Sequence, residues 1–168
     1  MALSMHFLES SLYELAGLFL VPVLLLILLA LLYAFAALGG FAVEWWQRRG
    51  GRHRSALAAY RLASGAGSDD LELWIMRRLE LLRLASRTAP MLGLIATMIP
   101  MGPALLALGR GDAASVGENL VTAFSAVILA LVAASITFWV LTVRRRWLLQ
   151  ELRDIEREAG EAGAAEEA

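Results

Sequence analysis

Three long apolar segments without a charged residue constrain the fold of this chain more than any other feature of its sequence. They are residues 15–43, 89–109 and 120–143. An α-helix needs about 20 apolar residues to cross the hydrocarbon core of a bilayer, so each segment is long enough to form one span. Hydrophobic residues make up 59% of the 168-residue chain, above the roughly 45–50% that is usual for a soluble domain. The sequence therefore predicts an all-α, polytopic membrane protein with three transmembrane helices that extend into the cytoplasm.

The first segment could alternatively be a secretory signal peptide, because Ala34-Phe35-Ala36 resembles a cleavage site. A signal peptide carries basic residues before its apolar run. Here Glu9 and Glu14 precede the run, and arginines follow it. We therefore expect an uncleaved span.

Basic residues near the span ends indicate the orientation of the chain, since they favour the cytoplasmic side. Residues 44–88 contain nine arginines, and three more arginines directly follow the third span at 144–146. Arg110 is the single basic residue between the second and third spans. We expect the chain to lie in a cytoplasmic (inner) membrane. Residues 1–14 and the loop 110–119 should lie on its outer side, and residues 44–88 and 144–168 should lie in the cytoplasm. Trp45, Trp46 and Trp147 then mark the inner membrane boundary, where amphipathic rings prefer to lie.

The cytoplasmic region 44–88 contains a short flexible linker, residues 63–67, followed by an amphipathic helix that Ser68 caps. One face of this helix is apolar and consists of Leu71, Trp74, Ile75, Leu79, Leu82 and, at its edge, Ala85. The helix either lies on the membrane surface or packs against other cytoplasmic helices and leads into the second span. A break is expected only at Ala89, because Pro90 disfavours helical backbone in the preceding residue.

The third helix is expected to continue into the cytoplasm to about Glu158, because Leu148, Leu152 and Ile155 extend its apolar stripe. From Gly160 onward the small and acidic residues predict a disordered tail.

The spans lack the groups that enzymes and ion carriers need. No Asp, Glu, His, Lys or Arg lies within them, so the chain alone cannot hold a proton at the centre of the membrane. His6 and His53 are isolated, and there is no phosphate-binding loop or catalytic arrangement. We expect no enzymatic activity, cofactor, metal site or nucleic-acid partner. We expect membrane lipid to surround the spans. The span hydroxyls are Thr97, Thr122, Ser125, Ser135, Thr137 and Thr142, most of which should bond to backbone carbonyls of their own helix or join helices.

The stretch APMLGLIATMIPMGPAL in the second segment resembles the second-span block of the MotA/TolQ/ExbB proton-channel family. Pro90, the pair Gly93-Leu94, Thr97 and Pro100 carry this resemblance. Gly111-Asp112 and the third-span stretch NLVTAFSAVILALVAASI agree with it. The resemblance covers about residues 79–146 and is closest to the short three-span members typified by TolQ and ExbB, with an archaeal-type IPMGPAL turn.

The resemblance implies a homo-pentamer around single-span, ExbD/TolR-like partner helices, in which a membrane Asp of the partner carries the proton. Thr97, Thr122 and Ser125 would line the ion pathway. Pro90, Gly93, Pro100, Gly102, Pro103 and Ala130 would shape or pack the helices. Prolines and glycines are tolerated in such a span because neighbouring helices or water satisfy the freed carbonyls, and those that Pro100 and Pro103 release would face the partner or water.

One departure from the family leaves two functions open. Where members carry a threonine pair and then a glycine in the third span, this chain has Ala126, Val127 and Ala130. The chain is either a conducting motor subunit or a non-conducting membrane scaffold of the same fold. A third possibility, an amphipathic regulator at the membrane surface, would not need three spans.

Overall fold

The computed structural model describes residues 15, 17–50, 56–64 and 67–166. Within these residues four helices follow one another: α2 (Leu20–Arg49), α3 (Ala56–Ser64), α4 (Ser68–Gly109) and α5 (Ala113–Glu166). The described residues contain no strand, and α2, α4 and α5 are each long and apolar enough to cross a membrane. The all-α fold with three membrane-spanning helices is therefore confirmed.

The chain divides into two compact units whose limits fall inside the long helices. The first unit contains residues up to 35 together with 85–136, and the second contains 36–84 together with 137–168.

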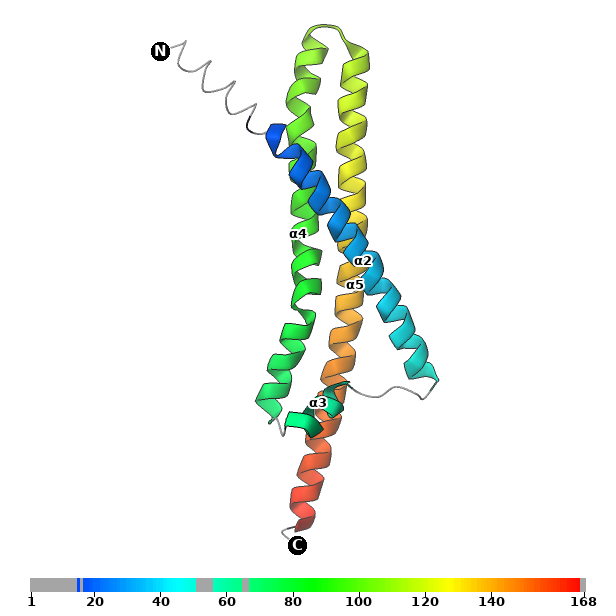
Figure 1. Ribbon diagram of the computed structural model, residues 1–168, viewed down its shortest axis with the longest axis vertical. Helices are drawn as coiled ribbons and strands as arrows, with labels where there is room; N and C mark the ends of the chain where they lie inside the picture. Colours follow the sequence, from blue (N-terminus) through cyan, green and yellow to red (C-terminus); the bar gives the residue numbers. More distant parts are fainter. Residues whose placement is uncertain (1–14, 16, 51–55, 65–66, 167–168) are drawn as a thin grey trace, which may run out of the picture. The chain divides into compact units, whose positions relative to one another are not determined.

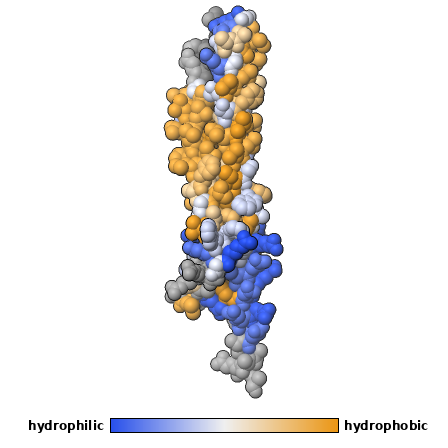
Figure 2. Space-filling view, turned by 90° about the vertical axis from the view of Figure 1, so that its right-hand side faces the viewer, coloured by the Kyte–Doolittle hydropathy of each residue, from blue (hydrophilic) through white to orange (hydrophobic). Residues whose placement is uncertain are grey.

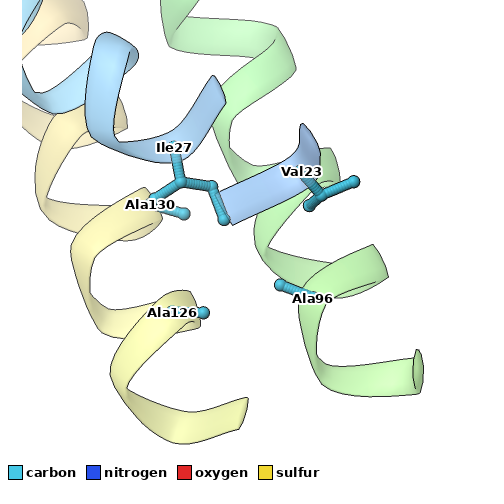
Figure 3. Close-up of a cluster of buried hydrophobic side chains, with 5 residues drawn as sticks. All are labelled: Val23, Ile27, Ala96, Ala126 and Ala130. Carbon is cyan, nitrogen blue, oxygen red and sulfur yellow. The ribbon is translucent and has the colours of Figure 1, made fainter. Parts of the chain in front are cut away.

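In the first unit, α4 and α5 run antiparallel and are joined by the short turn 110–112 (Figure 1). Val23 and Ile27 of α2 pack onto Ala96 of α4 and onto Ala126 and Ala130 of α5 (Figure 3). A second buried cluster is formed mainly by alanines and contains Ala34, Ala89, Ala133 and Ala134. Small residues at such contacts let helix backbones approach closely, which is how helices associate in lipid.

Large apolar side chains cover the surface of the first unit, as Figure 2 shows for one of its faces. Leu94, Phe124 and Ile128 are each more than half exposed. An outward apolar face combined with an interior of small residues is the reverse of a water-soluble bundle and fits a lipid environment.

In the second unit, the predicted apolar face at the start of α4 is turned inward. Leu71, Ile75, Leu79 and Leu82 are buried, while the charged residues at 77, 80 and 83 are exposed. The structure therefore supports the alternative in which this helix packs against protein and leads into the second span.

The helix α3 was not anticipated by the sequence analysis, and α5 holds it in the second unit. Leu57 of α3 is fully buried, Arg61 donates to the carbonyl of Ile155 at 3.4 Å, and Tyr60 stacks on Trp74 at 5.7 Å. The linker residues 65–66, together with His6 and His53, lie outside the described residues.

The expected break before Pro90 does not occur, because α4 runs without interruption through Pro90, Pro100 and Pro103. One proline inside a helix removes a single backbone hydrogen bond, whereas a helix end leaves about four carbonyls without an intrahelical partner. Continuing the helix is therefore the less costly choice in lipid.

The helix boundaries differ from the sequence analysis at two other places. Residues 113–119, which were expected in the external loop 110–119, are helical and belong to α5, and residues 160–166 continue α5 where a disordered tail was expected. Ala and Glu favour helix, and extending an existing helix needs no new nucleus. The helix α4 does begin at Ser68, but the Ser68 hydroxyl donates to the carboxylate of Glu156 instead of capping its own helix.

Candidate ion pathway and helix seam

The helices α4 and α5 approach each other closely at Gly93 in the first unit. A Cβ atom placed on Gly93 would lie 2.9 Å from the Cβ of Ala130 and 3.3 Å from a methyl carbon of Val127. Ala130 is fully buried and Ala126 is 3% exposed. We call Gly93, Ala96, Ala126, Val127 and Ala130 the seam. It has no room for a larger side chain at Gly93.

The two prolines beyond the seam change the hydrogen bonding of α4. Neither Pro100 nor Pro103 has an N–H group, so they cannot donate to the carbonyls of Ala96 and Ile99. Ala96 is fully buried within the seam, so its carbonyl is shielded from the surroundings of the chain. This differs from the expectation that both released carbonyls face a partner or water, and the reason is the tight packing of α4 at this point. Pro100 is itself buried, and Pro90, Gly102 and Pro103 are partly buried.

The three hydroxyls assigned to the ion pathway do not contact one another. Thr97 is half-buried and donates to the carbonyl of Leu94 at 2.7 Å. Thr122 is exposed and donates to the carbonyl of Glu118 at 3.1 Å. Ser125 is exposed on α5, three residues from Thr122 and therefore on a similar face of that helix. The structure thus places Thr97 at the edge of the seam and the other two on the outer surface of α5.

The positions that lack the family's hydroxyls lie elsewhere. Ala126 is in the seam, packed with Val23 and Ile27 of α2, and Val127 is half-buried beside Gly93. A hydroxyl at Ala126 would therefore point into the packed interior of this chain. Ala126 and Val127 therefore belong to the seam and not to the exposed surface.

The turn between α4 and α5 is held by Asp112, which caps α5. One oxygen of Asp112 accepts the backbone N–H of Ser115 at 3.2 Å, and the other accepts the Ser115 hydroxyl at 2.5 Å. These hydrogen bonds lower the pKa of Asp112 below its ordinary value of 3.8, because they stabilise the carboxylate. Gly111, with φ of +74°, supplies the left-handed backbone that the turn needs.

A group of charged side chains in the second unit was missed by the sequence analysis. Glu44 of α2 is paired with Arg144 of α5 at 3.0 Å and with Arg48 at 3.4 Å, and Arg48 also reaches Glu151. The buried Nε atom of Arg48 has no hydrogen-bond partner among the described residues, and its guanidinium lies 4.5 Å from the ring centre of Trp147. The i,i+4 spacing of Glu44 and Arg48 was a visible signal. The partners about a hundred residues away left no signal in the sequence.

The described helices present apolar surfaces, a small-residue seam and a few hydroxyls, and residues 20–43, 89–109 and 120–143 contain no Asp, Glu, His, Lys or Arg. No group of acidic, histidine or cysteine side chains that could hold a metal ion occurs among the described residues. This architecture defines a multi-pass α-helical membrane protein whose spans pack through small residues and carry a few hydroxyls.

The comparisons with known proteins agree with this class. The model of the MotA/TolQ/ExbB proton channel family matches residues 58–157, which is more than half of the chain. The chain therefore belongs to the MotA/TolQ/ExbB proton channel family. Neither the comparison with curated proteins nor that with solved structures finds a match.

Proposed function

We propose that this chain is the ion-conducting subunit of a membrane motor complex in the cytoplasmic membrane and is not an enzyme. In this proposal five copies surround single-span partner helices, and an Asp of the partner carries the proton. The N-terminus lies outside and the C-terminus lies in the cytoplasm.

The observation that carries the proposal is the combination of a proton-channel family match with spans that lack any Asp, Glu, His, Lys or Arg. A proton pathway through lipid needs a titratable group or a water-filled passage. In this proposal a partner brings the carboxylate, and this chain supplies the wall around it.

Thr97 is the hydroxyl best suited to meet that carboxylate. It lies eight residues after Ala89, which corresponds to about 12 Å along a helix at 1.5 Å per residue, near the middle of a core about 30 Å thick. Its O–H donates to the carbonyl of Leu94, so its oxygen lone pairs remain able to accept a hydrogen bond. A protonated partner Asp, or a water molecule beside it, could provide the donor.

The second candidate function is a non-conducting scaffold of the same fold, which the missing hydroxyls at Ala126 and Val127 favour. The burial of Ala126 in the seam weakens this alternative, because a buried position contributes little to a pathway on the surface of the subunit. The exposed hydroxyls of Thr122 and Ser125 remain available to line that pathway.

The test is proton uptake into vesicles that contain this chain and its single-span partner. Thr97→Val keeps the shape of the side chain and removes the hydroxyl. We expect flux to fall at least about fivefold, the factor that corresponds to one hydrogen bond contributing about 1 kcal/mol. Thr142→Val is the matched control, because Thr142 is an exposed threonine whose hydroxyl bonds to its own helix.

Three outcomes separate the proposals. Reduced flux in Thr97→Val with normal flux in Thr142→Val supports conduction along Thr97. Equal flux in the unmodified complex and in Thr97→Val would refute the role of Thr97. An assembled complex without flux in any form would favour the scaffold, and a monomeric mass in mild detergent with the partner present would contradict the pentamer.

A further inference from the structure

The second unit contains an apolar groove between α2 and α5 that the proposed function does not use. It is lined by Leu38, Ala42 and Trp45 of α2 and by Trp139, Val143 and Trp147 of α5, and encloses about 350 Å³. Phe41 also lines the groove. The centroid of its ring lies 5.0 Å from the ring centroid of Trp139 and 5.2 Å from that of Trp147. Every lining side chain is apolar or an indole, so the groove suits a hydrocarbon.

The depth of the groove matches one acyl chain of a bilayer. Trp139 and Trp147 are eight residues apart on α5, or about 12 Å at 1.5 Å per residue. One leaflet contributes about half of a hydrocarbon core that is about 30 Å thick. The groove therefore extends over most of the depth of a leaflet, beginning where the apolar residues of α2 give way to charged ones.

The charged end of the groove is basic. Arg48, Arg49 and Arg144 lie there, together with Glu44 and Glu151, which leaves a net charge of +1 (three positive minus two negative). Arg48 and Arg144 are already paired with these carboxylates. Arg49 has no ion-pair partner within the described ranges, and its guanidinium lies 5.0 Å from the ring centre of Trp45. A cation without an ion-pair partner among the described residues is thus held at the rim of an apolar groove.

We propose that this groove binds an anionic phospholipid, with an acyl chain along the indole rings and the headgroup phosphate at Arg49. An apolar channel with a cationic end complements an amphiphile that has an anionic head. The aromatic side chains are already packed against one another, so binding does not require them to be ordered first. The site requires only that the helices lie in a membrane and is independent of ion conduction.

Intrinsic fluorescence can detect this lipid, because three of the five tryptophans of the chain line the groove. The full chain is reconstituted into phosphatidylcholine vesicles that contain a small fraction of brominated phosphatidylglycerol or brominated phosphatidylcholine with the same acyl chains. Bromine quenches nearby indoles, so we expect stronger quenching by the brominated phosphatidylglycerol. Quenching by brominated phosphatidylcholine measures the background from ordinary lipid contact.

Two pairs of variants assign the effect to the groove. Ala42→Phe fills the groove and should remove the excess quenching, whereas Ala36→Phe makes the same change on another face of α2 and should leave it. Arg49→Gln should lower the preference for phosphatidylglycerol about fivefold, which corresponds to about 1 kcal/mol for one basic residue near a membrane surface. Arg77→Gln removes an exposed arginine of α4 and should change nothing.

Several results would overturn the proposal. Equal quenching by both lipids would show that the groove does not select an anionic headgroup. Weak quenching by both would mean that protein, such as a second copy of the chain, covers the groove. If the excess quenching by brominated phosphatidylglycerol survives Ala42→Phe, or is lost equally in Ala36→Phe, the lipid that causes it is bound outside the groove. Circular dichroism of each variant verifies that the helices are retained.

Discussion

Replacing Gly93 with alanine adds a single methyl group at a tight contact between α4 and α5. The new Cβ would lie 2.9 Å from the Cβ of Ala130 and 3.3 Å from a methyl carbon of Val127. Carbon atoms prefer a separation of about 3.5–4.0 Å, so the two helices must move apart locally by at least about 0.6 Å from the 2.9 Å contact.

The cost follows from two opposing effects. Overfilling a packed interior costs about 1–3 kcal/mol, while replacing glycine by alanine within a helix gains about 1 kcal/mol. Gly117→Ala is the matched control, because a Cβ on that helical glycine meets nothing within 4 Å. Both variants gain the same stability from replacing a helical glycine with alanine. Gly93→Ala should therefore be less stable than Gly117→Ala by about 1–3 kcal/mol, the cost of overfilling the seam.

The free energy of unfolding can be measured by titrating the protein in mild detergent with a denaturing detergent and following circular dichroism. Combining Gly93→Ala with Ala130→Gly removes the closest contact. The double variant should therefore lose less stability than the sum of the single changes, with a coupling of about 0.5–3 kcal/mol. Equal stability of Gly93→Ala and Gly117→Ala, or strict additivity in the double variant, would refute the tight seam.

Three further predictions concern charge and topology. Glu44→Gln removes the ion pair with Arg144, which is largely shielded from solvent, and should lower the free energy of unfolding by about 1–2 kcal/mol in the same assay. The control Glu161→Gln removes an exposed ion pair and should lower it by close to zero. Equal effects of the two variants would contradict a stabilising role of the pair between Glu44 and Arg144. Because the pKa of Asp112 is lowered in the folded chain, its carboxylate stabilises the fold at any pH above its ordinary pKa of 3.8. This contribution is lost as the pH falls through the lower pKa of the folded state. The thermal midpoint should therefore fall on acidification below about pH 4, and it should fall less in Asp112→Asn, which still caps the helix; identical acid profiles would argue against the titration of this side chain. The chain has no native cysteine, so a cysteine introduced by Ala114→Cys is its single thiol. This thiol should react with a membrane-impermeant reagent added to the outer side. A reaction that occurs only after the cytoplasmic side is opened would show that the orientation is the opposite of the one proposed.

The sequence was sufficient to predict the three spans, because the free energy of placing a helix in lipid depends on the composition of that segment alone. The motif with Pro90, Gly93 and Thr97 was likewise readable as a stretch of sequence, and the family match over residues 58–157 confirms the resemblance that it carried. The inward face of the helix that begins at Ser68 followed from its periodicity.

Helix ends were harder to predict than helix faces. The structure continues α4 through Pro90 and begins α5 at Ala113. Local preferences of single residues indicated boundaries at these places. They were outweighed by the hydrogen bonds that a continuous helix retains and by the cap that Asp112 provides.

The tertiary structure alone decided which residues meet. Gly93 touches Ala130 across 37 positions, and Glu44 pairs with Arg144 across 100. It also decided that Ala126 lies in the seam while Thr122 and Ser125 lie on the surface. Helical periodicity shows which residues share a face, but in lipid the face that meets protein and the face that meets acyl chains are both apolar. Hydropathy cannot distinguish them, so close fit between small residues on separate helices makes that choice.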